Sequence, residues 1–349
     1  MSKVLIVGPR FYQFNESVAR AFASLGWETR IEAYDNPVHP YRGWLKVRYK
    51  FARDKAALRR ASRCRFSAAL ARVFDAWRPD LVFMMNGDMV APALTDRFRA
   101  AGARVALWLF DSVRRIPLGE DNLRHADAVF CYERSDIDWI RSRHGIEAHF
   151  LPQAVDTAMY HPIAGAEKKY DIVFAGDLYH SERRRRIVRR LVERYPDRRI
   201  CVWGIYKPWY KNPLRCLLRE RRDVYRNRNT DFRQLNEDYN GARLVLNIHH
   251  EQQRDGANPK VFEIAASGAF QVCDANPYIE RLFPHGELGL YHDDEELFCL
   301  IDAALAGDVS ARADAARREV CARHTFVHRV GQVLAVLNPD ESLGHPSGL

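Results

Sequence analysis

Short runs of apolar residues alternate with helical patterns in the first 151 residues of the chain. Residues 3–8 read KVLIVG, and residues 17–25 follow with apolar side chains at helical spacing. We predict further strands at residues 29–34, 80–85, 105–110, 128–131 and 149–151, and further helices at 66–77, 94–101 and 135–143. Strands that are apolar throughout and alternate with helices are typical of a parallel sheet covered on both faces.

The alternation stops at residues 152–169, which hold two prolines and show no periodicity, and it then resumes. We predict strands at 171–175, 200–203, 244–248, 270–273 and 288–291, and helices at 181–194, 232–240, 259–267, 279–283, 295–305 and 310–337. The predicted fold class is α/β, with two doubly wound, Rossmann-like domains. Their predicted bounds are 1–152 and 170–325, joined by a linker at 153–169 and followed by a C-terminal helix and loose tail at 326–349. This last helix can pack back on the first domain.

The formal net charge of +9 comes from two local segments. Residues 42–65 hold ten Lys or Arg against one acid, and residues 205–230 hold eight against two. Aromatic residues are interleaved with the cations in both segments, which suits an anionic membrane surface. A solvated helix face explains the same charge, and nucleic-acid binding is a third reading that no accompanying motif supports. We predict membrane contact through residues 41–65 and no nucleic-acid partner.

Length and cysteine content add two expectations. The 349 residues favour two domains over one. The seven cysteines are scattered without a CxxC pair, which fits a reducing cytoplasm better than a disulfide framework or a zinc site. The sequence shows no signal peptide and no apolar run of about 20 residues. We therefore predict a cytoplasmic protein that associates peripherally with the inner membrane face.

Residues 255–271, DGANPKVFEIAASGAFQ, predict a capped helix at an edge of the second sheet. Asn258 suits the N-cap, Pro259 suits the first helical position, and Gly268 suits the left-handed stop. In such sheets, ligands bind outside the carboxyl ends of the strands. The helix start offers free N–H groups to an anion, Lys260 adds a charge, and Glu263 can accept hydrogen bonds from vicinal hydroxyls. The alternative is an exposed Glu263 that merely pairs with Lys260.

Other candidates lie after predicted strands. Gly176 and the four arginines at 183–186 follow the first strand of the second domain. His249 and His250 follow a later strand; no third metal ligand is spaced to join them, so we assign His249 to the donor pocket and predict no metal. In the first domain, Asp111 is the candidate general base. The candidate acceptor-binding residues are Arg10, Asn86 and Asp88.

The segment DGANPKVFEIAASGAFQVCD resembles the signature of GT-B glycosyltransferases grouped with spore maturation protein CgeB, relatives of the class called glycosyl transferases group 1. Further segments that resemble the same family are LVFMMNGD, VALWLFDS, AHFLPQAVDTAMYHP, YDIVFAGDL, ARLVLNIHH and ERLFPHGELGLYHDDEEL. The resemblance covers most of residues 80–330 and is weak in 35–75. It implies the GT-B fold, in which two Rossmann-like domains face a central cleft.

The resemblance also implies residue roles. The wider class carries two acids with seven residues between them, which fall at Asp255 and Glu263. Glu263 would bind the ribose of a nucleotide, and Asp255, where the class usually has Glu, would lie near the donor sugar and the reaction. Lys260 and the Gly176 loop would hold the diphosphate, and enzymes of this fold generally need no metal or other cofactor. The predicted donor-binding set is Gly176, Arg183, Arg184, His249, Asp255, Gly256, Asn258, Lys260 and Glu263.

These expectations combine into one predicted function with two alternatives. We expect transfer of a sugar from a nucleotide-sugar donor to a lipid-linked or other glycan precursor, or to a protein acceptor, at the cytoplasmic membrane face. If the reaction inverts configuration, Asp111 is the expected base. The alternatives are a nucleotide-sugar epimerase of the same fold and a non-catalytic scaffold that binds sugar nucleotides.

Overall fold

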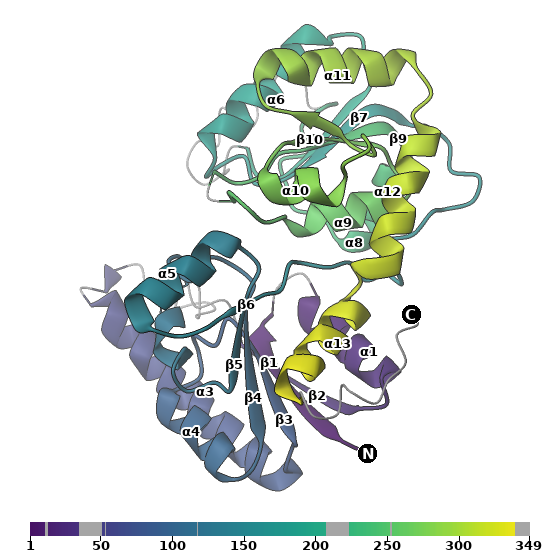
Figure 1. Ribbon diagram of the computed structural model, residues 1–349. Helices are drawn as coiled ribbons and strands as arrows, with labels where there is room; N and C mark the ends of the chain where they lie inside the picture. The colour runs from purple at the N-terminus through teal and green to yellow at the C-terminus, as the bar shows by residue number, and fades with distance from the viewer. Residues whose placement is uncertain are drawn as a thin grey trace. The chain divides into compact units, whose positions relative to one another are not determined.

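The protein forms two compact units, each built on a parallel sheet (Figure 1). The computed structural model describes residues 1–10, 13–34, 51–52, 54–116, 118–206, 223–251 and 253–338. The first unit comprises Met1–Pro152 and the chain from Phe326 onward; the second is Gln153–Thr325. The predicted linker at 153–169 belongs to the second unit. The predicted α/β class with doubly wound sheets is confirmed.

The first sheet has six strands in the order β2-β1-β3-β4-β5-β6, and every pairing is parallel. Its strands are β1 (Lys3–Pro9), β2 (Glu28–Tyr34), β3 (Leu81–Met85), β4 (Arg104–Leu109), β5 (Ala128–Cys131) and β6 (His149–Phe150). All five residues of β3 are buried, as are five of the six in β4. Central strands buried on both faces explain why these runs are apolar throughout.

Helices cover both faces of the first sheet (Figure 1). They are α1 (Phe14–Ser24), α3 (Lys55–Trp77), α4 (Pro92–Ala100), the short η1 (Gly119–Asn122), α5 (Arg134–His144) and α13 (Phe326–Leu337). Helices α3 and α4 pack together through Phe74 and Phe98, whose ring centroids lie 4.5 Å apart. On the other face α13 packs against α1, with the rings of Phe14 and Phe326 6.2 Å apart. The buried Arg329 donates from Nε to the carbonyl of Pro152 and fixes α13 to its own unit.

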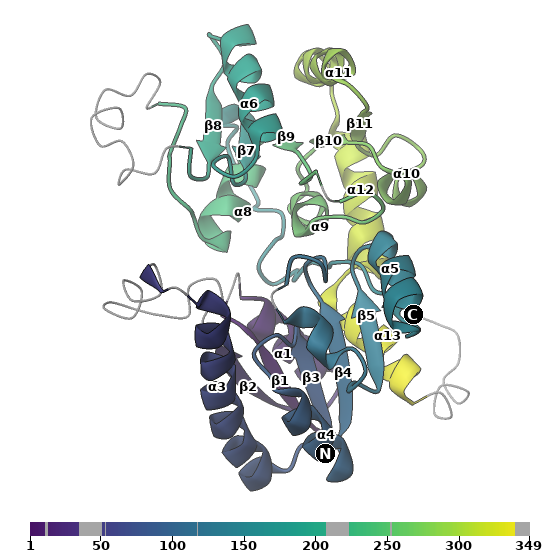
Figure 2. The same cartoon turned by 90° about the vertical axis from the view of Figure 1, so that its left-hand side faces the viewer.

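The second sheet has five parallel strands in the order β11-β10-β9-β7-β8. They are β7 (Tyr170–Ala175), β8 (Ile200–Trp203), β9 (Ala242–Asn247), β10 (Gln271–Asp274) and β11 (Gly289–Tyr291). The helices are α6 (Glu182–Arg194), α8 (Phe232–Asn240), α9 (Pro259–Ala266), α10 (Pro277–Leu282), α11 (Asp294–Ala306) and α12 (Ser310–Arg323). Helices α6 and α11 lie together on one face of the sheet, and α8, α9 and α12 lie on the other (Figures 1 and 2).

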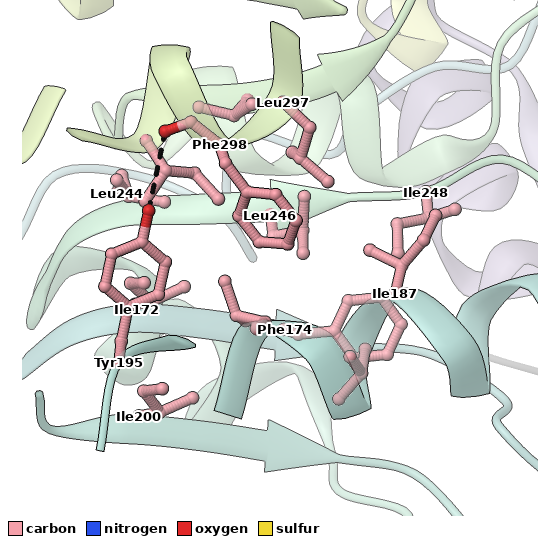
Figure 3. Packing of buried hydrophobic residues seen from close by; sticks show 14 of the residues in the cluster. Ile172, Phe174, Ile187, Tyr195, Ile200, Leu244, Leu246, Ile248, Leu297 and Phe298 are labelled. Atoms are coloured by element: carbon pink, nitrogen blue, oxygen red, sulfur yellow. Dashed lines mark hydrogen bonds between the residues drawn. The ribbon is translucent and has the colours of Figure 1, made fainter. Parts of the chain in front are cut away.

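Aliphatic and aromatic side chains from the sheet, α6 and α11 form one core in the second unit (Figure 3). Phe174 and Leu246 come from adjacent strands, Ile187 comes from α6, and Phe298 comes from α11. The hydroxyl of Tyr195 donates to the carbonyl of Phe298 at 3.4 Å, the bond drawn in Figure 3. Full burial of each such side chain contributes about 1.5–3 kcal/mol, so this core holds the strands whose carboxyl ends carry the candidate site.

The predicted helical segment at 310–337 is two helices, because α12 ends at Arg323, and α13 begins at Phe326 in the other unit. Part of the basic segment 41–65 and most of 205–230 lie outside the described residues, as does the predicted tail from residue 339. None of the helices in the described ranges has the length and apolar character that a membrane crossing requires.

Candidate functional site

The start of α9 lies beside the carboxyl end of β9, as the sequence predicted. The side chain of Asn258 accepts from the backbone N–H of Val261 at 3.2 Å, and Pro259 occupies the first turn. Gly268 has a φ of +76°, the left-handed conformation that glycine adopts without strain. The predicted caps are therefore confirmed. The amide of Asn258 also donates to Asn247 at 2.9 Å, so this predicted donor-binding residue ties α9 to β9.

Lys260 and Glu263 are half-buried and lie one turn apart on α9. Burial lowers the pKa of Lys260, and the nearby Glu263 carboxylate opposes that shift. Burial raises the pKa of Glu263, against the charge of Lys260 and a hydrogen bond from the Tyr160 hydroxyl. Half-burial disfavours the alternative in which Glu263 is a fully exposed side chain. The pair places one cation and one hydrogen-bond acceptor at the same edge of the sheet.

Arg183 and Arg184 are the two members of the arginine run that bond within the site. Ser181 caps α6 by accepting from the backbone N–H of Arg184 at 3.3 Å. Arg184 directs Nε and Nη2 at the carbonyl of Ile248, at 3.0 and 2.7 Å. Burial lowers the pKa of Arg184 despite nearby carboxylates. Arg184 therefore holds the end of β9, while Arg183 stays about one-third exposed.

The next two arginines bond elsewhere. Arg185 donates to the carbonyl of Tyr179, and Arg186 pairs with Asp294 of α11 at 2.6 Å. Gly176 follows β7, and its N–H donates to the carbonyl of Trp203. Gly176 thus lies at the same edge of the sheet as the starts of α6 and α9.

His249 lies in a buried cluster that sequence spacing did not reveal. Oδ1 of Asp274 lies 2.7 Å from Nδ1 of His249, and Oδ2 accepts from Arg183 at 2.7 Å. His249, Cys273 and Asp274 each offer one metal-ligand atom, and these three atoms lie within 4.8 Å of one another. Cys273 and Asp274 are thus potential ligands that the spacing around His249 and His250 did not suggest, and the absence of a metal stays a prediction. β9 and β10 are neighbours, so their ends meet at one edge.

The cluster is arranged for hydrogen bonding rather than for coordination. The His249 nitrogen and the Asp274 oxygen are at hydrogen-bond distance, closer than two ligands of one metal ion normally lie. The guanidinium of Arg183 already supplies positive charge to Asp274. Burial raises the pKa of the Cys273 thiol, which disfavours the thiolate that a metal binds.

Asp255 and Gly256 face α10 in this structure. Oδ1 of Asp255 pairs with Nη2 of Arg281 at 2.6 Å, and the carbonyl of Gly256 accepts from Asn276 at 3.0 Å. Asn276 is also the N-cap of α10. The loop before α9 is therefore tied to the loop before α10, and contact between Asp255 and a donor sugar stays a prediction.

In the first unit, Asp111 and Asn86 lie together at the carboxyl ends of neighbouring strands. Asn86 accepts from the backbone N–H of Phe110 at 2.9 Å, and Asp111 accepts from Ser112 at 2.8 Å. Arg115 lies 3.5 Å from Asp111, which is half-exposed. This arrangement leaves Asp111 accessible to solvent, as a general base requires, and its catalytic role stays a prediction.

Asp88 and Arg10 lie in different surroundings. Asp88 is buried, and the Tyr34 hydroxyl lies 2.5 Å from its Oδ1. Burial raises the pKa of Asp88 to about 6, although the Tyr34 hydrogen bond opposes this. Arg10 is exposed at the end of β1. Of the predicted acceptor-binding residues, Asp88 is thus enclosed by protein, while Arg10 and the half-buried Asn86 are not.

Comparison with known proteins finds a family model that matches part of the chain, and solved structures of the same fold. Residues 183–335 match the family model described as "Glycosyl transferase-like". Sucrose-phosphate synthase from Thermosynechococcus elongatus has a similar structure, with 12% identity, a TM-score of 0.69 and coverage of 97% of this chain and 100% of its own. A comparison with curated proteins finds no match.

Two further solved structures show the same fold. α,α-Trehalose 6-phosphate synthase from Burkholderia multivorans is 15% identical, with a TM-score of 0.64 and coverage of 99% of this chain and 100% of its own. A protein from Anabaena in complex with UDP and glucose is 12% identical, with a TM-score of 0.60 and coverage of 97% and 100%. The resemblance inferred from sequence is therefore confirmed: residues 183–335 match the glycosyl transferase-like family model, and the chain has the GT-B fold of these solved structures.

Proposed function

We propose that the protein is a glycosyltransferase that moves a sugar from a nucleotide-sugar donor to an acceptor hydroxyl. The observation that carries the proposal is the placement of Lys260 and Glu263 one turn apart at the capped start of α9, beside the carboxyl end of β9. This edge is where parallel α/β sheets bind ligands. The family match covers the same helix, and the Anabaena protein of the same fold was solved with UDP and glucose.

The leaving diphosphate sets the electrostatic requirement of the reaction. Negative charge grows on the bridging oxygen as the bond to the sugar breaks, and fixed cations and N–H groups lower that barrier. Lys260, the exposed part of Arg183 and the first N–H groups of α9 supply this positive potential in the proposal. Glu263 accepts hydrogen bonds from the ribose hydroxyls, and Asp255 lies toward the sugar. The proposal needs no metal ion for these roles.

For the acceptor we propose a lipid-linked glycan precursor at an anionic membrane surface. The support is the basic, aromatic composition of residues 41–65. The described part of this segment includes the start of α3, where Lys55 and Arg60 are exposed. Each cation near an anionic leaflet contributes about 1 kcal/mol to membrane binding.

The experiment that tests this function compares sugar transfer with its alternatives in one assay. The full chain is incubated with nucleotide sugars, with and without a membrane extract that contains lipid-linked acceptors, and sugar-bearing products are identified by mass spectrometry. Acceptor-dependent product supports transfer. Conversion of the donor sugar without an acceptor supports the epimerase, and binding without any turnover supports the scaffold.

A further inference from the structure

Asp274, the last residue of β10, joins three elements of the second unit through one carboxylate. Its Oδ1 accepts from the backbone N–H of His249 at 2.8 Å and from the Nδ1 side of the same ring at 2.7 Å. Its Oδ2 accepts from Nη1 of Arg183 at 2.7 Å. His249 follows β9, and Arg183 lies in the first turn of α6, which follows β7. Since β10, β9 and β7 are adjacent, Asp274 links three neighbouring loops at the carboxyl edge.

The second ring nitrogen of His249 lacks a partner. Nε2 is buried and makes no hydrogen bond to any described residue, and the side chain is only 2% exposed. A buried polar atom without a partner is unfavourable, and a bound ligand is one reason for a protein to keep it. The bond from Nδ1 to Asp274 determines that Nε2 is the nitrogen left for that ligand.

The charges around Nε2 indicate the chemistry of the ligand. Burial by itself raises the pKa of Asp274, but the charges and hydrogen bonds of His249 and Arg183 outweigh it and lower the pKa, so the carboxylate is ionised. A ring that donates from Nδ1 to a carboxylate can also donate from Nε2–H to a phosphate oxygen, in the form that carries both ring protons. The Arg183 guanidinium forms an ion pair with the same carboxylate, and the Arg183 side chain is about one-third exposed. Two donors that contact one carboxylate match the oxygens of a phosphate group.

We propose that Asp274 is a positioning residue that holds Nε2 of His249 and the guanidinium of Arg183 toward the phosphate oxygens of a nucleoside diphosphate. The inference rests on the proposed function, because it assigns the phosphate contacts of the same donor site. It goes beyond the acids and the lysine of α9, since Asp274 touches no ligand itself and acts through two other side chains.

The substitution Asp274→Asn tests this role because it removes one of two acceptor oxygens while keeping the size of the side chain. An amide has a single acceptor oxygen, so the variant cannot accept from both His249 and Arg183 as the carboxylate does. The variants are Asp274→Asn, His249→Gln and the double variant. The matched control is Asp171→Asn: Asp171 has the same 10% exposure, accepts from the N–H of Arg199 at 2.9 Å, and lies at the opposite, amino end of β7.

Binding is measured by calorimetry on the full chain with UDP, GDP, ADP and dTDP. For whichever of these binds the wild-type protein, Asp274→Asn and His249→Gln should each weaken binding by about 10-fold, the range of a charge-assisted hydrogen bond. The double variant should be little weaker than the weaker single variant, because the two residues act as one unit. Asp171→Asn should bind as the wild type does.

A spectroscopic readout separates positioning from mere stability. In protein labelled with ¹⁵N-histidine, the His249 ring is identified by the signal that His249→Gln removes. Nδ1 should donate a hydrogen bond to Asp274 in the wild type, and Asp274→Asn should shift the Nδ1 signal by altering that bond. Added nucleoside diphosphate should shift the Nε2 signal, whereas inorganic phosphate tests whether the phosphate group alone is sufficient.

The outcomes distinguish this inference from the proposed function. If the wild type binds none of the four nucleoside diphosphates, the proposed function itself fails. If the wild type binds one of them and Asp274→Asn and His249→Gln bind it as Asp171→Asn does, the role of Asp274 is overturned while the proposed function stands. Should Asp274→Asn not fold, calorimetry of His249→Gln and the Nε2 signal of the wild-type ring decide the question: unchanged binding and an Nε2 signal that nucleoside diphosphate does not shift would overturn the proposal.

Discussion

The hydroxyl of Tyr160 hydrogen-bonds to the carboxylate of Glu263. Tyr160 belongs to the segment that the sequence predicted as a linker, and Glu263 lies on α9. The ring of Tyr160 also stacks with that of Tyr239 from α8, with centroids 6.3 Å apart. The segment before β7 is therefore part of the packing that orients the predicted ribose-binding acid.

Glu263→Gln should weaken nucleoside diphosphate binding by about 10- to 100-fold, because a charged acceptor contributes about 1.5–3 kcal/mol to its hydrogen bonds. Tyr160→Phe should have a smaller effect in the same direction, since it removes an orienting bond and no ligand contact. Calorimetry with UDP and with pyrophosphate checks this. Pyrophosphate has no ribose, so equal losses for both ligands in Glu263→Gln would contradict the ribose assignment.

Lys260→Met should weaken binding of pyrophosphate and of nucleoside diphosphate alike, by about 10-fold or more, because it removes a half-buried cation from the phosphate site. The matched control is Lys168→Met. Lys168 is more exposed than Lys260, but its Nζ likewise lies in partly buried surroundings, where it donates to the carbonyls of Asn240 and Ala242. This control should lower the melting temperature and leave pyrophosphate binding unchanged; the same binding loss in both variants would refute a specific role for Lys260.

The free energy of unfolding of the first unit should fall as the pH rises from about 4 to about 6, because Asp88 loses its proton over this range. Its pKa is raised from 3.8 to about 6 in the folded protein, so the folded state favours the protonated carboxyl. That stabilisation is fully present below pH 3.8 and lost above about pH 6, and amounts to at most about 3 kcal/mol. Asp88→Asn should remove this pH dependence from thermal melts. An identical pH profile in wild type and variant would exclude the buried carboxyl as its source.

Gly204→Ala should destabilise the second unit by about 3 kcal/mol or more, because steric overlap with the backbone adds to backbone strain. Gly204 has a φ of +124°, and a Cβ there would overlap the carbonyl oxygen of Gly176. Gly26→Ala is the control, since Gly26 also has a positive φ, +84°, but no atom within 4 Å of the added Cβ. The control should cost about 1 kcal/mol. Thermal melting that shows equal losses would mean that the close approach to Gly176 does not constrain the fold.

The strands and the α9 caps were predictable because their signals are local. An apolar run such as β3 and the Asn-Pro start with a Gly stop of α9 need no distant partner. The break between α12 and α13 was not predicted, because the helical pattern of residues 310–337 continues across the point where the chain passes from the second unit to the first. Asp274 was missed for a related reason: its partners, His249 and Arg183, lie 25 and 91 positions away. Only the order of the strands brings their ends together.

The most direct test of the central claim is a screen of nucleotide sugars for release of nucleoside diphosphate and for thermal stabilisation of the full chain. The wild type should be stabilised by at least one donor and should release its nucleoside diphosphate, and a Lys260→Met/Glu263→Gln variant should lose both responses. If no nucleotide sugar stabilises the wild-type protein or is turned over by it, the assignment of a sugar-transfer site at α9 is wrong.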